Sequence, residues 1–406
     1  MLTPDYLASC SDYLLGMYDQ LETQIVTDIA RRIAKNGVPT QTAIWQYQQV
    51  QEIGALQDEI HEEIAAMTGK TSGEIARLFE EAGAKNVETN VGPLISHGIE
   101  AEVNMSDAMR QVLEAEIRRT QGDIYNLTKT MAGTSASLYQ QYSNQAYLQV
   151  TSGAFSPQQA IRMAVKGAAK EGAYVQFPKR RDHLDVAVRR NLITSINQTA
   201  AALTDMQAED MGVEYYEVSA HAGARPSHAE WHGRIYKIEG SSWEYPNFYE
   251  STGMGEADGL CGVNCRHTYY PFWPGISKPN WPASKLRAFD EHTVSYDGGD
   301  YTDYEASQIQ RGMERGIRSD RRELASLDAA IQACDDEEIV KGLTEEFKTM
   351  STQLKERERR LQDFCHQTGR ALESNRVQVH AYKDQAGRIV RWDRSLAQKA
   401  IWATKR

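Results

Sequence analysis

Apolar residues recur at steps of three and four through most of the first 170 residues, and this helical periodicity constrains the fold more than any other feature of the chain. The repeat is clearest over residues 12–34, after which Asn36 and Gly37 offer a left-handed helix stop. Its apolar face consists of Leu14, Tyr18, Leu21, Ile25, Ile29 and Ile33. Similar patterns cover residues 40–67, 71–84 and 106–132. We therefore expect residues 1–170 to form a helical region without strands.

The stretch MTGKTS, residues 67–72, contains the Gly-Lys-Thr of phosphate-binding loops. Ile64 stands where that motif requires its first glycine, so a phosphate loop is not expected. We interpret the stretch as a turn between two helices, with Thr71 or Ser72 as the N-cap of the second.

After residue 170 the pattern changes. Residues 212–223, GVEYYEVSAHAG, alternate and are rich in Tyr and Val, which predicts a strand. Residues 240–282 are dominated by Gly, Pro and aromatic residues and predict a long irregular loop region. Helical patterns resume near Tyr304, and two of them joined at CDDEE, residues 334–338, predict a helical hairpin. The tail predicts two short strands around a turn at residues 384–387.

The expected fold class is mainly α with a small α+β domain. Along the chain this gives a helical N-terminal assembly region at 1–170 and an irregular α+β domain that carries His and Cys motifs at 171–300. A helical hairpin at 301–375 and a short β-hairpin with a tail at 376–406 follow.

Composition excludes several classes of protein. The 406 residues carry a formal net charge of -11, which argues against general coating of nucleic acid. The N-terminus has no secretory pattern and no apolar run approaches the length of a membrane span, so we expect a protein that stays in the cytoplasm where it is made. Five cysteines, an odd number, favour reduced thiols over a disulfide framework.

Two dense stretches carry most of the residues capable of chemistry, SAHAGARPSHAEWHGRIY at 219–236 and GLCGVNCRHTYYPFWPG at 259–275. His228 and His232 are four residues apart, and Cys261 and Cys265 have three residues between them. Two Cys and two His can hold zinc tetrahedrally, with His221 and His267 as substitutes. The set we favour for a structural zinc site is His228, Cys261, Cys265 and His267.

Two other interpretations of these stretches stay open. In the first, the histidines bond loop carbonyls and the cysteines pack as small apolar residues. In the second, Cys265 is a nucleophile activated by His228 or His267, with Arg225 or Arg266 holding an anion.

A stripe of arginines lies on the first helix of the predicted hairpin, opposite its apolar face. We expect this stripe to be a solvated face with Glu partners or, alternatively, a face that binds a partner protein or DNA. Its members are Arg311, Arg315, Arg318 and Arg322.

The two dense stretches, followed by YEASQIQRGMERGIRSDRR and QLKERERRLQDFCHQTGR, closely resemble the minor capsid protein 2 family of tailed phages, which is similar to the Mu F-like head-morphogenesis proteins. The resemblance extends upstream through HLDVAVRRNLITSINQTAA and IARRIAKNGVPTQTAIWQ. The shared elements map onto His221, Gly223, Arg225, Pro226, His228, Trp231, Gly233, Cys261, Asn264, Cys265, Arg266 and His267.

The resemblance implies a structural, non-enzymatic protein of the phage head. It further implies a place inside the capsid near the portal vertex, reached from the host cytoplasm during assembly, and a role in head assembly or DNA packaging. The portal protein would be its partner, with the major capsid or scaffold protein as others, while DNA contact is secondary and a membrane is not involved. The alternative function is a metal-dependent or thiol hydrolase carried in the head.

Overall fold

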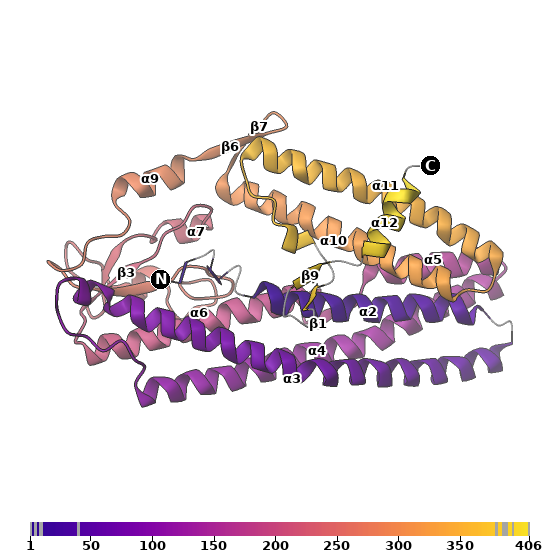
Figure 1. Ribbon diagram of the computed structural model, residues 1–406, viewed down its shortest axis with the longest axis horizontal. Helices are drawn as coiled ribbons and strands as arrows, with labels where there is room; N and C mark the ends of the chain where they lie inside the picture. The colour runs from indigo at the N-terminus through magenta and orange to yellow at the C-terminus, as the bar shows by residue number, and fades with distance from the viewer. Residues whose placement is uncertain are drawn as a thin grey trace. The chain divides into compact units, whose positions relative to one another are not determined.

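The computed structural model of the chain describes residues 2–3, 6–7, 11–38, 41–377, 381–383, 389–391 and 394–404 (Figure 1). It is 69% helical and its few sheets are small and antiparallel, which confirms the predicted fold class. The described part of residues 1–170 contains helices α2 (Asp12–Asn36), α3 (Thr42–Ser96), α4 (Asp107–Thr151) and α5 (Pro157–Glu171) and no strand, as predicted. Helix α2 ends where the sequence indicated, because Gly37 takes a φ of 61°.

The chain divides into two compact units, each built from three separate segments. Unit 1 comprises Met1–Asp12, Thr71–Ile124 and Arg189–Ile309, and unit 2 comprises Tyr13–Lys70, Tyr125–Val188 and Gln310–Arg406. Helices α3, α4, α6 (Leu184–Asp210) and α10 (Asp303–Ala333) each contribute residues to both units. The units therefore cut across the four consecutive segments expected along the sequence.

Unit 1 is built around a three-stranded antiparallel sheet of order β4-β3-β5, formed by β3 (Tyr215–Val218), β4 (Ile235–Lys237) and β5 (Tyr269–Phe272). Strand β3 confirms the strand predicted in GVEYYEVSAHAG. Tyr216 lies opposite Tyr236 on one side and Pro271 on the other. Aromatic side chains fill the core beside the sheet. The ring centroid of Phe248, in helix α8 (Phe248–Thr252), lies 5.0 Å from that of Tyr216.

Buried amide side chains join the helices of unit 1. Asn86 and Asn90 of α3 both donate to the Thr204 hydroxyl of α6, at 2.9 and 3.0 Å. Asn90 also donates to the side-chain oxygen of Gln207 at 2.8 Å, so three amide-donated hydrogen bonds link the two helices.

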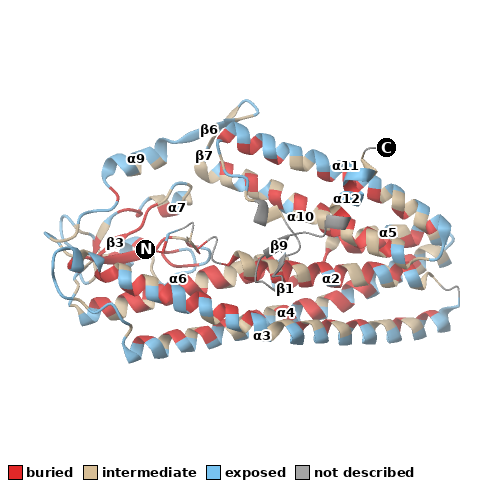
Figure 2. Ribbon diagram, in the orientation of Figure 1, coloured by how far each residue is buried: buried red, intermediate tan, exposed pale blue. Residues whose placement is uncertain are grey.

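The remaining elements of unit 1 are the short helix α7 (Pro226–Ala229), the exposed helix α9 (Ala283–Glu291) and the hairpin of β6 (Thr293–Tyr296) and β7 (Gly299–Thr302). Helix α9 has no buried residue, and Figure 2 shows it in the exposed colour. Asp297 and Gly298 both have positive φ angles, as the tight turn between paired strands requires.

Unit 2 is a helical assembly with two small hairpins. Helix α10 is followed by α11 (Glu337–Thr368), whose first turn is capped by Asp336, and the two form the predicted helical hairpin (Figure 1). Helix α11 packs against α5 and α12 (Arg394–Ala403), and Lys166 of α5 pairs with Glu346 of α11 at 2.7 Å. A two-stranded hairpin, β1 (Val175–Phe177) with β2 (Arg180–Asp182), precedes α6.

The tail of the chain pairs β8 (Ala381–Lys383) with β9 (Ile389–Arg391), after the short 3-10 helix η1 (Ser374–Val377), which confirms the two predicted strands. The turn expected at residues 384–387 lies outside the described residues. Helix α12, which follows, had no counterpart in the prediction from sequence.

The turn predicted at MTGKTS is wrong, because α3 runs without interruption through residues 67–72. Gly69 and Gly73 sit in this helix with open space around them and without a positive φ. Ile64 and Ile75, on either side of the stretch, are both buried, so one apolar face continues through it.

Candidate functional site

The sheet of unit 1 brings the two dense stretches together. Strand β3 leads into the first stretch and β5 ends the second, and the two strands pair over four residues. Beyond the strands, the Ser219 amide donates to the Thr268 carbonyl at 2.8 Å, and the Thr268 amide donates to the Ser219 hydroxyl at 2.9 Å. Residues 219–236 and 259–275 therefore form one structural feature, which we call the His/Cys site.

Helix α7 places His228 in the His/Cys site. Pro226 occupies its first position, where the missing N–H costs nothing, and His228 is 2% exposed. The Nε2 atom of His228 lies 2.9 Å from the Asp258 carbonyl oxygen, to which it donates. Arg225, just before the helix, donates to the Val263 carbonyl at 2.7 Å. These two bonds hold α7 against the loop that carries the cysteines.

That loop is folded too tightly for most side chains. A Cβ atom on Gly259 would lie 1.9 Å from the Gly253 carbonyl oxygen, and one on Gly262 would lie 2.5 Å from that of Ala257. Cys261 and Asn264 take left-handed φ angles of 58° and 57°, an unusual conformation for a residue with a Cβ atom.

Helix α6 supplies the polar groups that hold this loop in place. The Asn197 side-chain amide donates to the carbonyls of both Cys265 and His267, at 3.2 and 2.9 Å. The backbone N–H of Asn264 donates to the Thr194 hydroxyl at 3.2 Å. Sequence reasoning did not single out Asn197 or Thr194; the available signal was a run of polar residues on an otherwise apolar helix.

Three of the four predicted metal ligands converge. One ligand atom each from His228, Cys265 and His267 lies within 4.8 Å of the other two, and all three residues are buried. The Cys265 sulfur is 3.7 Å from Nδ1 of His228 and 3.7 Å from Nδ1 of His267. The Cys261 sulfur lies outside this group and faces the His267 carbonyl oxygen at 3.7 Å.

His267 is the centre of a cluster of aromatic rings. The ring centroids of His221 and His232 lie 4.5 and 5.8 Å from its own, and that of Trp231 lies at 4.9 Å. The Nε2 atom of His267 is buried and has no hydrogen-bond partner among the residues that the structure describes. His221 donates Nδ1 to the Ala222 carbonyl at 2.9 Å.

Burial sets the charge of the His/Cys site. It lowers the pKa of His228, His232 and His267, and that of His221 to about 4, so the four rings are neutral at pH 7. Burial also raises the pKa of Cys265, which keeps its thiol protonated. The nearby guanidinium of Arg266 also lowers the pKa of His221.

Two glycines of the first dense stretch, Gly223 and Gly233, lie where the backbone is left-handed. Gly223 and Gly233 take φ angles of 70° and 68°. A Cβ atom on Gly233 would lie 2.5 Å from Leu286, and one on Gly223 would lie 3.4 Å from the Asp303 backbone. Trp231 is buried, and its carbonyl accepts the hydroxyl of Tyr236 at 3.0 Å.

The arginine stripe does not form one exposed face. Arg315 is exposed and Arg311 is half-buried, but Arg322 is buried and only 12% of the Arg318 side chain is exposed. The expectation of a solvated, partner or DNA face is therefore wrong for Arg318 and Arg322. Neighbouring helices of unit 2 cover this part of α10 because they carry the opposite charge.

Those two arginines pair with buried carboxylates of unit 2. Arg318 lies 3.1 Å from Asp185 of α6, and Arg322 lies 3.5 Å from Asp19 and 3.6 Å from Glu22 of α2. The three carboxyls are close enough to hold a cation. The guanidinium groups already supply that charge, so we assign an ion-pair centre.

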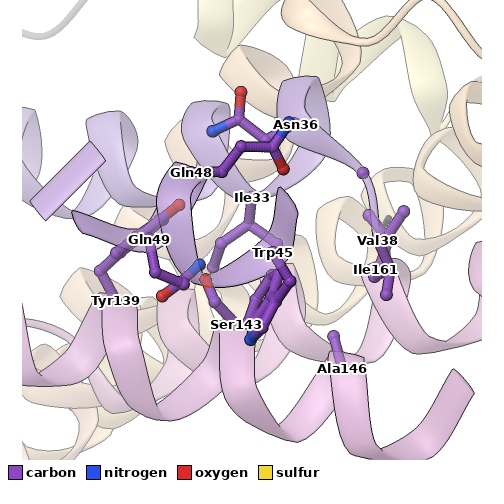
Figure 3. Close-up of a pocket in the computed structure, with 11 residues that line it drawn as sticks. Ile33, Asn36, Val38, Trp45, Gln48, Gln49, Tyr139, Ser143, Ala146 and Ile161 are labelled. Carbon is purple, nitrogen blue, oxygen red and sulfur yellow. The ribbon is translucent and has the colours of Figure 1, made fainter. Parts of the chain in front are cut away.

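A hollow in unit 2 is lined by residues of α2, α3, α4 and α5, including Asn36, Trp45 and Tyr139 (Figure 3). Gln48 and Gln49 border the same space, and it has room for about one water molecule. The hollow is thus too small for an organic ligand. Among the described residues, no helix has an apolar run long enough to cross a membrane.

Fold and site together define the class: a mainly helical protein with a small α+β unit that encloses a buried His/Cys site. A protein named "Structural protein" from Lactococcus phage LL-H is similar, with 22% identity over 294 residues that cover 68% of this chain and 75% of the relative. The family model of phage minor capsid protein 2 matches residues 2–366, and the chain belongs to this family. No solved structure matches the chain.

Proposed function

We propose that this phage structural protein acts near the portal vertex, inside the head, in head assembly or DNA packaging, and that it does so by binding other head proteins. Membership of the minor capsid protein 2 family supports the assignment to the particle. The portal protein is the proposed main partner, with the major capsid or scaffold protein as the others, and the host cytoplasm is where assembly takes place.

The observation that carries a binding role is an apolar patch on unit 2. Ile44, Tyr47 and Val50 follow one another at three-residue steps on α3 and are 45%, 67% and 69% exposed. Leu148 of α4, 64% exposed, follows Tyr147, whose ring stacks on Trp45 at 4.9 Å. Exposed apolar side chains on one face of a helix favour a surface that a partner covers. We call Ile44, Tyr47 and Val50 the α3 patch.

For the His/Cys site we propose a structural role rather than catalysis. A nucleophilic cysteine needs an accessible thiolate. Cys265 is 1% exposed and burial raises its pKa, so the thiol form dominates. This favours a structural role over the hydrolase considered from the sequence.

The test is quantitative mass spectrometry of purified, nuclease-treated particles of the encoding phage, with copies of this chain counted per portal ring. Replacing Ile44, Tyr47 and Val50 together by Ser should reduce the copy number at least about tenfold, because a buried apolar contact is lost. The matched control replaces Gln46 and Gln51, exposed polar residues of the same helix, by Ser and should leave the copy number unchanged. Particles that assemble normally and contain none of the wild-type chain would refute the proposal.

A further inference from the structure

We propose that His228, Cys265 and His267 bind one zinc ion, and that this ion fastens helix α7 to the cysteine-bearing loop of unit 1. The inference concerns the chemistry of the His/Cys site and is independent of the proposed place in the phage head. It also changes the set expected from the sequence, because Cys261 is not a ligand.

The spacing of the donor atoms fits tetrahedral zinc. Bonds of about 2.05 Å to nitrogen and about 2.3 Å to sulfur, at the tetrahedral angle, separate the two atoms by about 3.6 Å. The Cys265 sulfur lies 3.7 Å from Nδ1 of both His228 and His267. A cation between the three atoms accounts for both contacts.

The hydrogen bonds around the site orient the lone pairs. His228 donates its Nε2 proton to the Asp258 carbonyl at 2.9 Å, which leaves the lone pair on Nδ1, the atom that faces Cys265. A backbone carbonyl that binds the far ring nitrogen is the usual partner of a metal-binding histidine. Asn197 fixes the other two ligands through the carbonyls of Cys265 and His267. The ligands are therefore held by the fold before an ion arrives.

The chemistry of the donors selects the metal. Two imidazoles and one thiolate suit zinc, whereas magnesium and calcium require oxygen ligands. The three residues are between 1% and 2% exposed, and with three protein ligands the fourth position of a tetrahedral zinc ion would be taken by a water molecule.

The experiment uses the full chain, purified after expression with added zinc. Elemental analysis should find about one zinc per chain, and X-ray absorption should show one sulfur at about 2.3 Å with nitrogen neighbours at about 2.0 Å. Cobalt added to the metal-free chain should give the intense visible bands of a tetrahedral site and a sulfur-to-cobalt charge-transfer band. A wild-type chain that binds neither zinc nor cobalt overturns the proposal.

Two variants sharpen the assignment. Cys265→Ser should reduce bound zinc at least tenfold and abolish the cobalt charge-transfer band. Cys261→Ser is the matched control: it alters a buried cysteine of the same loop whose sulfur lies outside the group, so zinc should remain at about one per chain. Equal loss in both variants, with the helical circular dichroism retained, would overturn the three-ligand assignment. If Cys265→Ser does not fold, the sulfur count from X-ray absorption of the wild-type chain decides, and two sulfurs would refute it.

Discussion

At the residue scale, the His/Cys site depends on side chains that lie far from it in the sequence. Asn197 is fully buried and satisfies two carbonyls of the loop at once. Cys261 and Asn264 hold left-handed backbone conformations that the surrounding contacts must enforce. The loop therefore takes its shape from α6 as much as from its own residues.

The first residue-scale prediction concerns Asn197. Asn197→Ala should lower the free energy of unfolding of the chain by about 2–4 kcal/mol, because two buried carbonyls lose their donor. Chemical denaturation followed by circular dichroism measures this. Gln198→Ala is the control, since Gln198 is exposed and reaches only the Cys261 carbonyl, at 3.4 Å. Similar losses for both variants would contradict the special role of Asn197.

A second prediction separates backbone strain from steric clash. Gly233→Ala should cost about 2–3 kcal/mol, since in a left-handed conformation its Cβ atom would lie 2.5 Å from a Leu286 methyl group, which can shift, and 3.1 Å from the Cβ atom of the buried Trp281. Gly212→Ala, also at positive φ but with nothing within 4 Å, should cost only about 1 kcal/mol. Thermal unfolding of the two variants gives the comparison, and equal shifts in Tm would remove the steric argument.

The site was partly predictable at this scale. The His and Cys residues of the two dense stretches suggested a metal site, and the structure brings three of them, His228, Cys265 and His267, together. Membership of Cys261 could not be read from spacing, because it depends on a left-handed turn that points its sulfur toward a carbonyl. Asn197 could not be found from the motif, because nothing in the sequence pairs α6 with the loop.

At the element scale, the periodic helices and the end of α2 were predictable, whereas the extent of α3 was not. Helix α2 and the hairpin of α10 and α11 follow their apolar repeats and caps. Helix α3 spans 55 residues and continues through Gly69 and Gly73, where the sequence suggested a turn. A glycine in the interior of a helix costs about 1 kcal/mol, and serine and threonine there cost less. Burial of one continuous apolar face can offset these costs.

This difference gives a prediction for Gly69. Gly69→Ala should raise the free energy of unfolding by about 0.5–1 kcal/mol, because alanine favours the helix and nothing lies within 4 Å of the added methyl group. A turn at this position would make the same change destabilising. The control is Gly37→Ala at the end of α2, where a φ of 61° should make alanine unfavourable. Urea unfolding of both variants tests the sign.

At the scale of the whole molecule, charge is distributed differently in the two units. Unit 1 buries neutral rings and thiols at the His/Cys site. Unit 2 buries three carboxyls against two guanidinium groups, and His183 lies 2.6 Å from Glu22 within the same network. The Glu22 carboxylate raises the pKa of His183 above its ordinary value of 6.5, and burial raises the pKa of Asp19 in the same network to about 8.

The whole-molecule prediction is a fall in the stability of unit 2 as pH rises. His183 has a raised pKa in the folded chain. Its contribution to the stability of unit 2 is therefore complete below pH 6.5, the ordinary pKa of histidine, and is lost as pH rises through the raised pKa. Hydrogen exchange of peptides from α2 and α10, corrected for intrinsic rates, should show protection decreasing between about pH 6 and 8.5. His183→Gln should reduce this dependence without abolishing it, because burial also raises the pKa of Asp19 in the same network to about 8. Protection that increases with pH in the wild-type chain would contradict the argument.

The sequence by itself determined the helical class, the strand beside the histidines and the residue types of the proposed metal site, because periodicity and composition are local properties of the chain. It also carried enough of the family pattern to indicate a phage structural protein. Only the tertiary structure decided that Cys261 lies outside the ligand group, that Asn197 holds the loop and that Arg318 and Arg322 are buried. These outcomes depend on contacts between segments up to about 300 residues apart, such as Asp19 and Arg322, and no local pattern encodes such pairings.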